Sequence, residues 1–217
     1  MSAPPNSGGP VDPSVARRAH WDAVYAQKPD AELSWFQSDP TTSLALIAEI
    51  SPAPARVIDV GGGQSALAGV LLGRPGIGDV AVLDISLHAI DRARERLGAD
   101  ATRVRWLCTD LLAPQPLGPV DLWHDRAVFH FLTEPADRAR YVDAAARAVV
   151  PGGHAIVATF DLTGPERCSG LPVQRWDAHT LAAVFAPAFA PVAAVQERHV
   201  TPWGKPQDFT YALLRRA

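Results

Sequence analysis

The sequence predicts an α/β protein: a mostly parallel, seven-stranded sheet with an antiparallel last strand and helices on both faces. Three observations support this. Runs of β-forming residues alternate with amphipathic helical segments along most of the chain. A glycine run follows the first predicted strand and leads into a helical segment. Aspartates stand at the ends of successive strands. This alternation is typical of a parallel sheet that is covered on both faces.

Composition limits the classes of protein that the chain can represent. Its 217 residues suit one domain, and its formal net charge of -3 gives no general attraction to nucleic acid or anionic membranes. No apolar run reaches membrane-spanning length. The two cysteines, Cys108 and Cys168, lie far apart and indicate neither a disulfide framework nor a metal site. We therefore expect a cytoplasmic protein with no nucleic-acid or membrane partner.

The amino-terminal part divides into a tail and a helical cap. Residues 1–10 are rich in Pro, Gly and Ser, which predicts a disordered tail without the features of a signal peptide. Residues 11–217 are expected to form a single domain, in which residues 11–50 make the cap.

Two helices are predicted within the cap. The sequence Asp12-Pro13-Ser14 is typical of a helix start, and this helix is expected to run to about Gln27. Its Trp21 and Tyr25 share one face, where they serve either as core anchors or as a lid over a ligand. A second short helix is predicted over residues 41–50.

The remaining elements alternate until the last two strands. Helices are predicted over residues 64–72, 86–97, 133–150 and 177–185. Parallel strands are predicted over residues 57–60, 79–84, 103–110, 120–124 and 154–160. Residues 187–201 and 209–214 look like two strands joined by a turn, which predicts a closing hairpin.

The central stretch of the chain runs from Val57 to Ser65 and reads as strand, tight turn and helix. Its three glycines, Gly61-Gly62-Gly63, allow backbone N–H groups to approach a ligand closely. The run also satisfies the relaxed dinucleotide-binding pattern, so the glycines alone do not identify the cofactor. Asp59 lies within the strand, where a buried carboxylate is costly unless it is bonded.

Two more aspartates, Asp84 and Asp110, close the second and third strands. Ligands of parallel sheets bind outside the carboxyl ends of the strands. Repeated acids at these ends therefore indicate one ligand that touches several strands, with Asp84 suited to a ribose diol.

This ordered series resembles the class I S-adenosylmethionine-dependent methyltransferases over nearly the whole chain. The resemblance implies their Rossmann-like fold and S-adenosylmethionine as cofactor. It implies that the acidic strand residue and glycine loop, Asp59, Gly61 and Gly63, hold the methionine part. Asp84 would bind the ribose hydroxyls, and Asp110 would meet the adenine amine. Further cofactor contacts implied are Gly62, Ser65, Ile85 and Leu111; Ser65 stands where a third glycine is common.

An aromatic entry segment suggests a narrower resemblance. Residues 20–25 and 34–36 are similar to a W-x-x-x-Y plus W-F segment in the branch containing the lysine methyltransferases of elongation factor 1A and citrate synthase. In that branch the equivalents of Trp21, Tyr25 and Trp35 contact the cofactor. Such an aromatic face would suit a sulfonium cation or an adenine ring. Phe36 is then a candidate substrate contact.

The end of the fourth strand holds the candidate catalytic residues. Asp125 could contact the cofactor or orient the acceptor, or it could cap a turn. His130 could act as general base, since an unperturbed histidine titrates near neutrality, or it could be a packed core residue. Arg126 could bind an anionic acceptor or pair with a neighbouring acid.

A long loop over residues 161–176 follows the fifth strand on the ligand side. Its Gly and Pro content and its length favour a function, and we expect it to form part of the acceptor pocket. Cys168 within it could contact the substrate or simply be packed.

The predicted function is in-line transfer of a methyl group, which mainly requires alignment of the acceptor and exclusion of water. We favour a small-molecule acceptor, with a protein lysine as the alternative. An NAD-type oxidoreductase and a non-catalytic cofactor-binding module also remain open.

Overall fold

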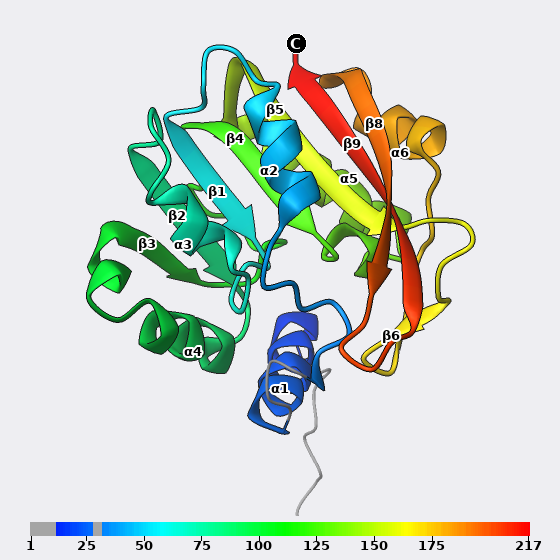
Figure 1. Cartoon of the computed structure of the whole chain (residues 1–217). Helices are drawn as coiled ribbons and strands as arrows, with labels where there is room; N and C mark the ends of the chain where they lie inside the picture. Colours follow the sequence, from blue (N-terminus) through cyan, green and yellow to red (C-terminus); the bar gives the residue numbers. More distant parts are fainter. Residues whose placement is uncertain (1–11, 28–31) are drawn as a thin grey trace, which may run out of the picture.

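The computed structural model describes residues 12–27 and 32–217, so the predicted tail lies outside the described residues. A seven-stranded sheet runs through the molecule in the order β3-β2-β1-β4-β5-β9-β8 (Figure 1). Strand β9 pairs antiparallel with both neighbours, and the other pairs are parallel. The predicted fold class is thereby confirmed. The strands are β1 (Arg56–Val60), β2 (Asp79–Asp84), β3 (Val104–Cys108), β4 (Val120–Arg126), β5 (Val149–Phe160), β8 (Phe189–Val200) and β9 (Pro206–Arg216).

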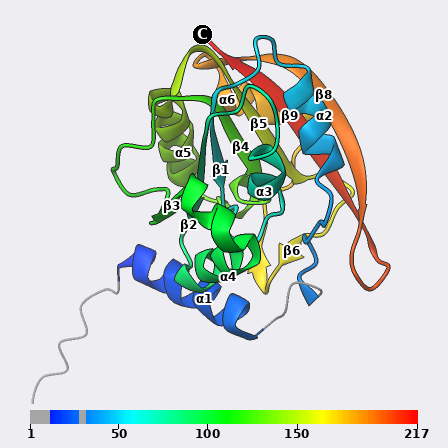
Figure 2. The ribbon, with the colours of Figure 1, turned by 60° about the vertical axis from the view of Figure 1, so that its left-hand side comes forward.

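Helices pack on both faces of the sheet because its residues alternate in direction. Val57 packs among residues of α2 and α3, whereas Ile58 packs among residues of α5 and α6. Helix α1 packs against α4 and lies below the carboxyl ends of the strands (Figures 1 and 2). The helices are α1 (Pro13–Gln27), α2 (Thr41–Ala48), α3 (Leu67–Leu71), α4 (Leu87–Leu97), α5 (Pro135–Ala148) and α6 (Ala178–Phe185), with 3-10 helices η2 (Gly98–Arg103) and η3 (Phe129–Phe131).

Three segments differ from the predicted elements. Helix α3 begins three residues later than predicted, because Ser65 still belongs to the turn and its hydroxyl accepts a hydrogen bond from Leu67 N. Strand β5 begins at Val149, although a proline and two glycines follow. The predicted loop over residues 161–176 contains a small hairpin, β6 (Arg167–Cys168) and β7 (Leu171–Pro172), turning at Ser169 and Gly170 with positive φ.

The described helices include none that is both long and apolar enough to cross a bilayer.

Candidate active site

The glycine turn after β1 is pressed against two neighbouring elements. Gly61 has a φ of +68°, and a Cβ there would meet Val128 Cγ2 at 2.0 Å. Its N–H donates to Leu83 O at 2.7 Å, which fastens the turn to β2. A Cβ at Gly63 would lie 2.7 Å from Asp84 Oδ2. Both positions therefore require glycine, and the turn lies directly beside the carboxyl end of β2.

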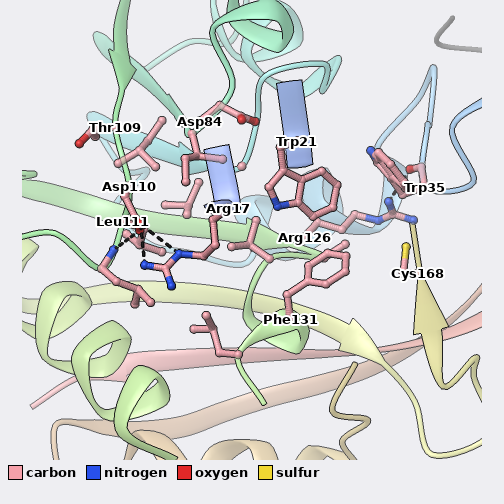
Figure 3. Close-up of a pocket in the computed structure, with 18 of the residues that line it drawn as sticks. Arg17, Trp21, Trp35, Asp84, Thr109, Asp110, Leu111, Arg126, Phe131 and Cys168 are labelled. Atoms are coloured by element: carbon pink, nitrogen blue, oxygen red, sulfur yellow. Dashed lines mark hydrogen bonds and ion pairs between the residues drawn. The ribbon is translucent and has the colours of Figure 1, made fainter. Parts of the chain in front are cut away.

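A cleft of roughly 830 Å³, open solvent at its mouth included, lies at this edge of the sheet (Figure 3). Asp84 and Asp110 lie toward one end of it, and Trp35, Arg126 and Cys168 toward the other, with Trp21 and Phe131 between them. The predicted site residues that line this cleft are Trp21, Tyr25, Trp35, Gly61, Asp84, Ile85, Asp110, Leu111, Arg126 and Cys168.

Asp84 is a buried acid that faces the cleft. Its carboxylate accepts hydrogen bonds from Gly63 N at 3.1 Å and Ser86 N at 2.8 Å. Burial raises the pKa of Asp84 to about 6, although these backbone hydrogen bonds act in the opposite direction. The carboxylate is thus fixed in direction, as the recognition of a diol requires.

Asp110 has a partner that sequence analysis missed. Its Oδ2 accepts from Arg17 Nε at 3.0 Å and Nη2 at 2.7 Å, and its Oδ1 accepts from Leu112 N at 2.9 Å. Arg17 also lines the cleft. Arg17 lies four residues before Trp21, so the two side chains share one face of α1. This spacing could have identified Arg17 as a candidate site residue from the sequence.

A second, smaller hollow adjoins the cleft and shares Trp35, Val60, Gly61 and Arg126 with it. The predicted residues that line this hollow but not the main cleft are Phe36, Asp59, Gly62 and Ser65. The three strand acids therefore lie around two adjoining spaces and not one, with Asp59 in the hollow and Asp84 and Asp110 in the main cleft. Gly63 lines neither space and acts through its N–H on Asp84.

Asp59 is held by a histidine from the neighbouring strand β4. His124 Nδ1 lies 2.7 Å from Asp59 Oδ1, and its Nε2 lies 2.9 Å from Ser43 Oγ. All three side chains are buried and line the hollow. The parallel register places His124 directly opposite Asp59, a contact that depends on knowing the pairing of β1 with β4.

Arg126 lines both spaces, and each of its three guanidinium nitrogens donates a hydrogen bond to a protein group. Its Nε donates to the Tyr211 hydroxyl at 2.8 Å, Nη1 to Trp35 O at 2.7 Å and Nη2 to Glu197 Oε1 at 3.3 Å. Its guanidinium also lies 4.3 Å from the centre of the Phe209 ring. The contact with Glu197 matches the second interpretation of Arg126, a pair with a neighbouring acid. The bond to Trp35 O also fixes the backbone of the aromatic entry segment.

Trp21 is the centre of an aromatic cluster over the cleft. Its ring contacts those of Tyr25, Trp35 and Phe131, at centroid distances of 6.0, 6.1 and 4.9 Å. Phe131 was not among the predicted site residues; it reaches the cleft because η3 turns it back toward α1. The cluster therefore supplies an apolar aromatic part of the cleft lining, in which Trp35 and Phe131 stand edge-on to Trp21.

Asp125 lies outside both spaces. Its Oδ1 accepts from Val128 N at 2.8 Å, and its Oδ2 accepts from Phe129 N at 3.0 Å and from the Tyr141 hydroxyl at 2.6 Å. Burial raises the pKa of Asp125 to about 6, against the lowering effect of the Tyr141 hydrogen bond. These contacts match the alternative interpretation, a cap for the turn that follows β4.

His130 also lines neither space. Its ring packs 4.4 Å from that of Phe131 and 4.6 Å from that of Phe160, between centroids. Burial, with a smaller effect of Arg126, lowers the pKa of His130 to about 3. A neutral histidine among aromatic rings matches the core alternative, and the predicted general base has no geometric support in this arrangement.

Comparisons with known proteins agree with the fold. Residues 57–153 match the model of a methyltransferase domain. No protein of curated function matches the sequence significantly.

Solved structures of methyltransferases are similar over most of the chain. The N-methyltransferase NodS from Bradyrhizobium japonicum WM9, in complex with S-adenosyl-L-homocysteine, is 18% identical with a TM-score of 0.68, covering 90% of this chain and 97% of that one. The 1,6-didemethyltoxoflavin-N1-methyltransferase from Burkholderia thailandensis is 19% identical with a TM-score of 0.71, covering 96% of this chain and 92% of that one. A SAM-dependent methyltransferase from Anabaena variabilis ATCC 29413 is 13% identical with a TM-score of 0.72, covering 96% of this chain and 96% of that one. At these identities the likenesses show the shared fold.

The sheet order, the glycine turn and the acids at the strand ends define an α/β protein of the class I methyltransferase type. The domain match over residues 57–153 covers these parts of the site. Residues 57–153 are a methyltransferase domain by this match, and the chain as a whole has the fold of S-adenosylmethionine-dependent methyltransferases.

Proposed function

We propose that this chain is an S-adenosylmethionine-dependent methyltransferase that acts on a small-molecule acceptor, which binds in the aromatic part of the cleft, between Trp21 and Cys168. The main support is the mostly apolar lining of the cleft, to which α1 contributes Trp21 and Tyr25 and the entry segment contributes Trp35. Small-molecule sites are typically concave and mostly apolar, with few polar groups.

We propose that the cofactor occupies both adjoining spaces. Asp84 and Asp110 would hold the adenosine part, between the apolar side chains of Ile85 and Leu111, and the hollow beside Asp59 would hold the amino-acid part. The glycine turn between the two spaces allows close approach of the ligand to the backbone. Bound S-adenosylmethionine supplies an activated methyl group, so the protein mainly has to align the acceptor and exclude water.

The acceptor side of the cleft is lined by Trp21, Phe131, Leu132, Val128 and Cys168. These groups offer contact with a flat, largely apolar molecule. The neighbour from Burkholderia thailandensis was solved with a bound small molecule, 1,6-didemethyltoxoflavin, which gives this proposal a structural parallel. His130 lies outside the cleft with a pKa near 3, so we propose an acceptor whose attacking atom carries a free lone pair at neutral pH.

A protein lysine is the second candidate acceptor. Trp21, Tyr25 and Trp35, which suggested the lysine methyltransferase branch, all line the cleft. The comparisons do not support that branch, since the similar structures named above include none of its members.

Methyl transfer from labelled S-adenosylmethionine tests the acceptor class. Purified protein is incubated with metabolite fractions and, separately, with lysate protein. Label in small molecules is the expected result, and label only in protein would reverse the proposal. Cys168→Ser and Phe131→Ala should change KM for the acceptor more than KM for the cofactor. His130→Gln should leave the pH profile of kcat unchanged, unless this histidine is the base.

A further inference from the structure

The hollow beside the glycine turn contains a carboxylate oxygen whose role the fold alone does not explain. Asp59 Oδ2 is buried and has no hydrogen-bond partner among the described residues. It lies against the glycine turn, because a Cβ at Gly62 would come within 2.3 Å of it. An unpaired buried carboxylate oxygen is costly, so this atom is suited to accept from a donor that arrives with a ligand.

The other oxygen of Asp59 ends a continuous chain of buried polar groups. The chain begins at Arg126, whose Nε donates to the Tyr211 hydroxyl at 2.8 Å. Tyr211 is in turn hydrogen-bonded to Ser43. Ser43 Oγ lies 2.9 Å from His124 Nε2, and His124 Nδ1 lies 2.7 Å from Asp59 Oδ1.

Chemistry fixes the direction of the bonds at both ends of this chain. Arg126 only donates, so the Tyr211 hydroxyl accepts from it. The Asp59 carboxylate only accepts, so His124 donates to it from Nδ1. Burial raises the pKa of Tyr211 to about 12, so its hydroxyl keeps its proton.

The two ring nitrogens of His124 are thus both engaged, Nδ1 by Asp59 and Nε2 by Ser43. Linked hydrogen bonds polarise and strengthen one another in a buried environment. The chain therefore determines how the Asp59 carboxylate is rotated and which of its oxygens stays available.

We propose that His124, fixed by Ser43, is a positioning residue that turns Asp59 so that Oδ2 receives the ammonium group of the cofactor's amino-acid part. This inference rests on the proposed placement of the cofactor. His124 itself is not expected to touch the reacting atoms. It acts through Asp59, by holding one oxygen and leaving the other unpaired beside the glycine turn.

The test compares two ligands by titration calorimetry. S-Adenosylhomocysteine carries the ammonium group, whereas 5′-methylthioadenosine has the same nucleoside without the amino-acid part. His124→Phe should lower the affinity for S-adenosylhomocysteine about tenfold or more, the scale of a lost charge-assisted hydrogen bond. The affinity for methylthioadenosine should stay within about twofold of the wild-type value. A purely structural role would weaken both ligands equally, and that result would overturn the inference.

Three further variants complete the test. His124→Asn keeps an N–H near the position of Nδ1 and should restore S-adenosylhomocysteine affinity to within about threefold of wild type. Ser43→Ala removes the hydrogen-bond partner of His124 Nε2 and should weaken binding of that ligand alone by about threefold to fivefold, which keeps the test decisive if His124→Phe does not fold. His179→Asn, at an exposed position on α6, is the control and should change neither affinity.

The outcome also separates this inference from the cofactor assignment. Wild-type protein that binds neither ligand would overturn the assignment of the cofactor and this inference with it. Wild-type protein that binds both, with His124→Phe unchanged for S-adenosylhomocysteine, would overturn only the role of His124.

Discussion

The carboxyl ends of β2 and β4 each present a buried aspartate, and the two aspartates differ in what they face. Asp84 lines the cleft and is held by two backbone N–H groups. Asp125 lines neither space and is held by two backbone N–H groups and the Tyr141 hydroxyl. Burial raises both pKa values to about 6, so burial and titration do not distinguish them.

The difference comes from the turn that follows each strand. After β2 the chain enters α4, capped by Ser86, and the Asp84 carboxylate stays at the rim. After β4 the chain turns at Ala127, with a φ of 76°, into η3, whose N–H groups bind Asp125 from within. A strand-end acid is therefore available to a ligand only where the next turn leaves its oxygens uncovered.

Removal of Asp125 should produce the largest effect, and the effect should be on stability. Asp125→Ala leaves three buried donors without an acceptor, and each such loss costs roughly 1–3 kcal/mol, so we expect destabilisation of about 3 kcal/mol or more. Urea unfolding measures it. Asp143→Ala, at a mostly exposed aspartate on α5, is the matched control and should change stability by less than about 0.5 kcal/mol. If Asp125→Ala were as stable as wild type but had lost cofactor affinity, Asp125 would be the aspartate that binds the ligand and not a cap of the turn.

Removal of Asp84 should act mainly on binding. Asp84→Ala should reduce S-adenosylhomocysteine affinity by about 2 kcal/mol, roughly thirtyfold, because the ribose hydroxyls lose a charged acceptor. Calorimetric titration of the folded variant measures this loss. Asp79→Ala, at the opposite end of β2, where the side chain is 48% exposed, should bind like wild type. Equal affinity in both variants would show that the ribose lies elsewhere.

The raised pKa of Asp84 predicts that cofactor affinity falls in mild acid. The charged form accepts from the hydroxyls, so S-adenosylhomocysteine should bind about tenfold more weakly at pH 5 than at pH 7. Acidification does not cost stability through this group: its pKa in the folded chain is raised above the ordinary 3.8, so its contribution to stability falls as pH rises from about 4 to 6. The same titration of Asp84→Asn should lack this step.

The fold and the adenosine end of the site were predictable because both follow from order along the chain. Asp84 and Asp110 come at the ends of adjacent parallel strands, and such ends meet at one edge whatever the exact register. Ser86 and Asp177 begin the helices predicted over residues 86–97 and 177–185, and each caps its helix by accepting a hydrogen bond from the first turn.

The other end of the site depends on contacts that sequence order does not determine. Asp125 was predicted to face a ligand, but its direction depends on the turn at Ala127 and on Tyr141 in α5. His124 and Ser43 meet Asp59 only through the pairing of β4 with β1 and the packing of α2. Arg17 meets Asp110 across 93 positions in sequence, with no local pattern that links them.

Arg17 offers the smallest and most specific test of this edge. The ion pair with Asp110 is partly exposed, with 35% of the arginine side chain accessible, so its net contribution is about 0.2–1 kcal/mol. Arg17 donates to Asp110 Oδ2, whereas Leu112 N donates to Oδ1. A ligand amine that binds Oδ2 would therefore have to share this acceptor with the arginine. Arg17→Met keeps the apolar stem and should raise S-adenosylhomocysteine affinity slightly, by at most about threefold.

The neighbouring Arg18 provides the matched control for this last change. It lies on the same turn of α1, but its guanidinium contacts Cys108 Sγ at 3.4 Å and not an acid of the cleft. Arg18→Met should therefore leave affinity unchanged. If Arg17→Met alone lowers S-adenosylhomocysteine affinity tenfold or more, the arginine does not compete with the ligand for Asp110. That result would mean that Arg17 holds α1 closed over the bound nucleoside.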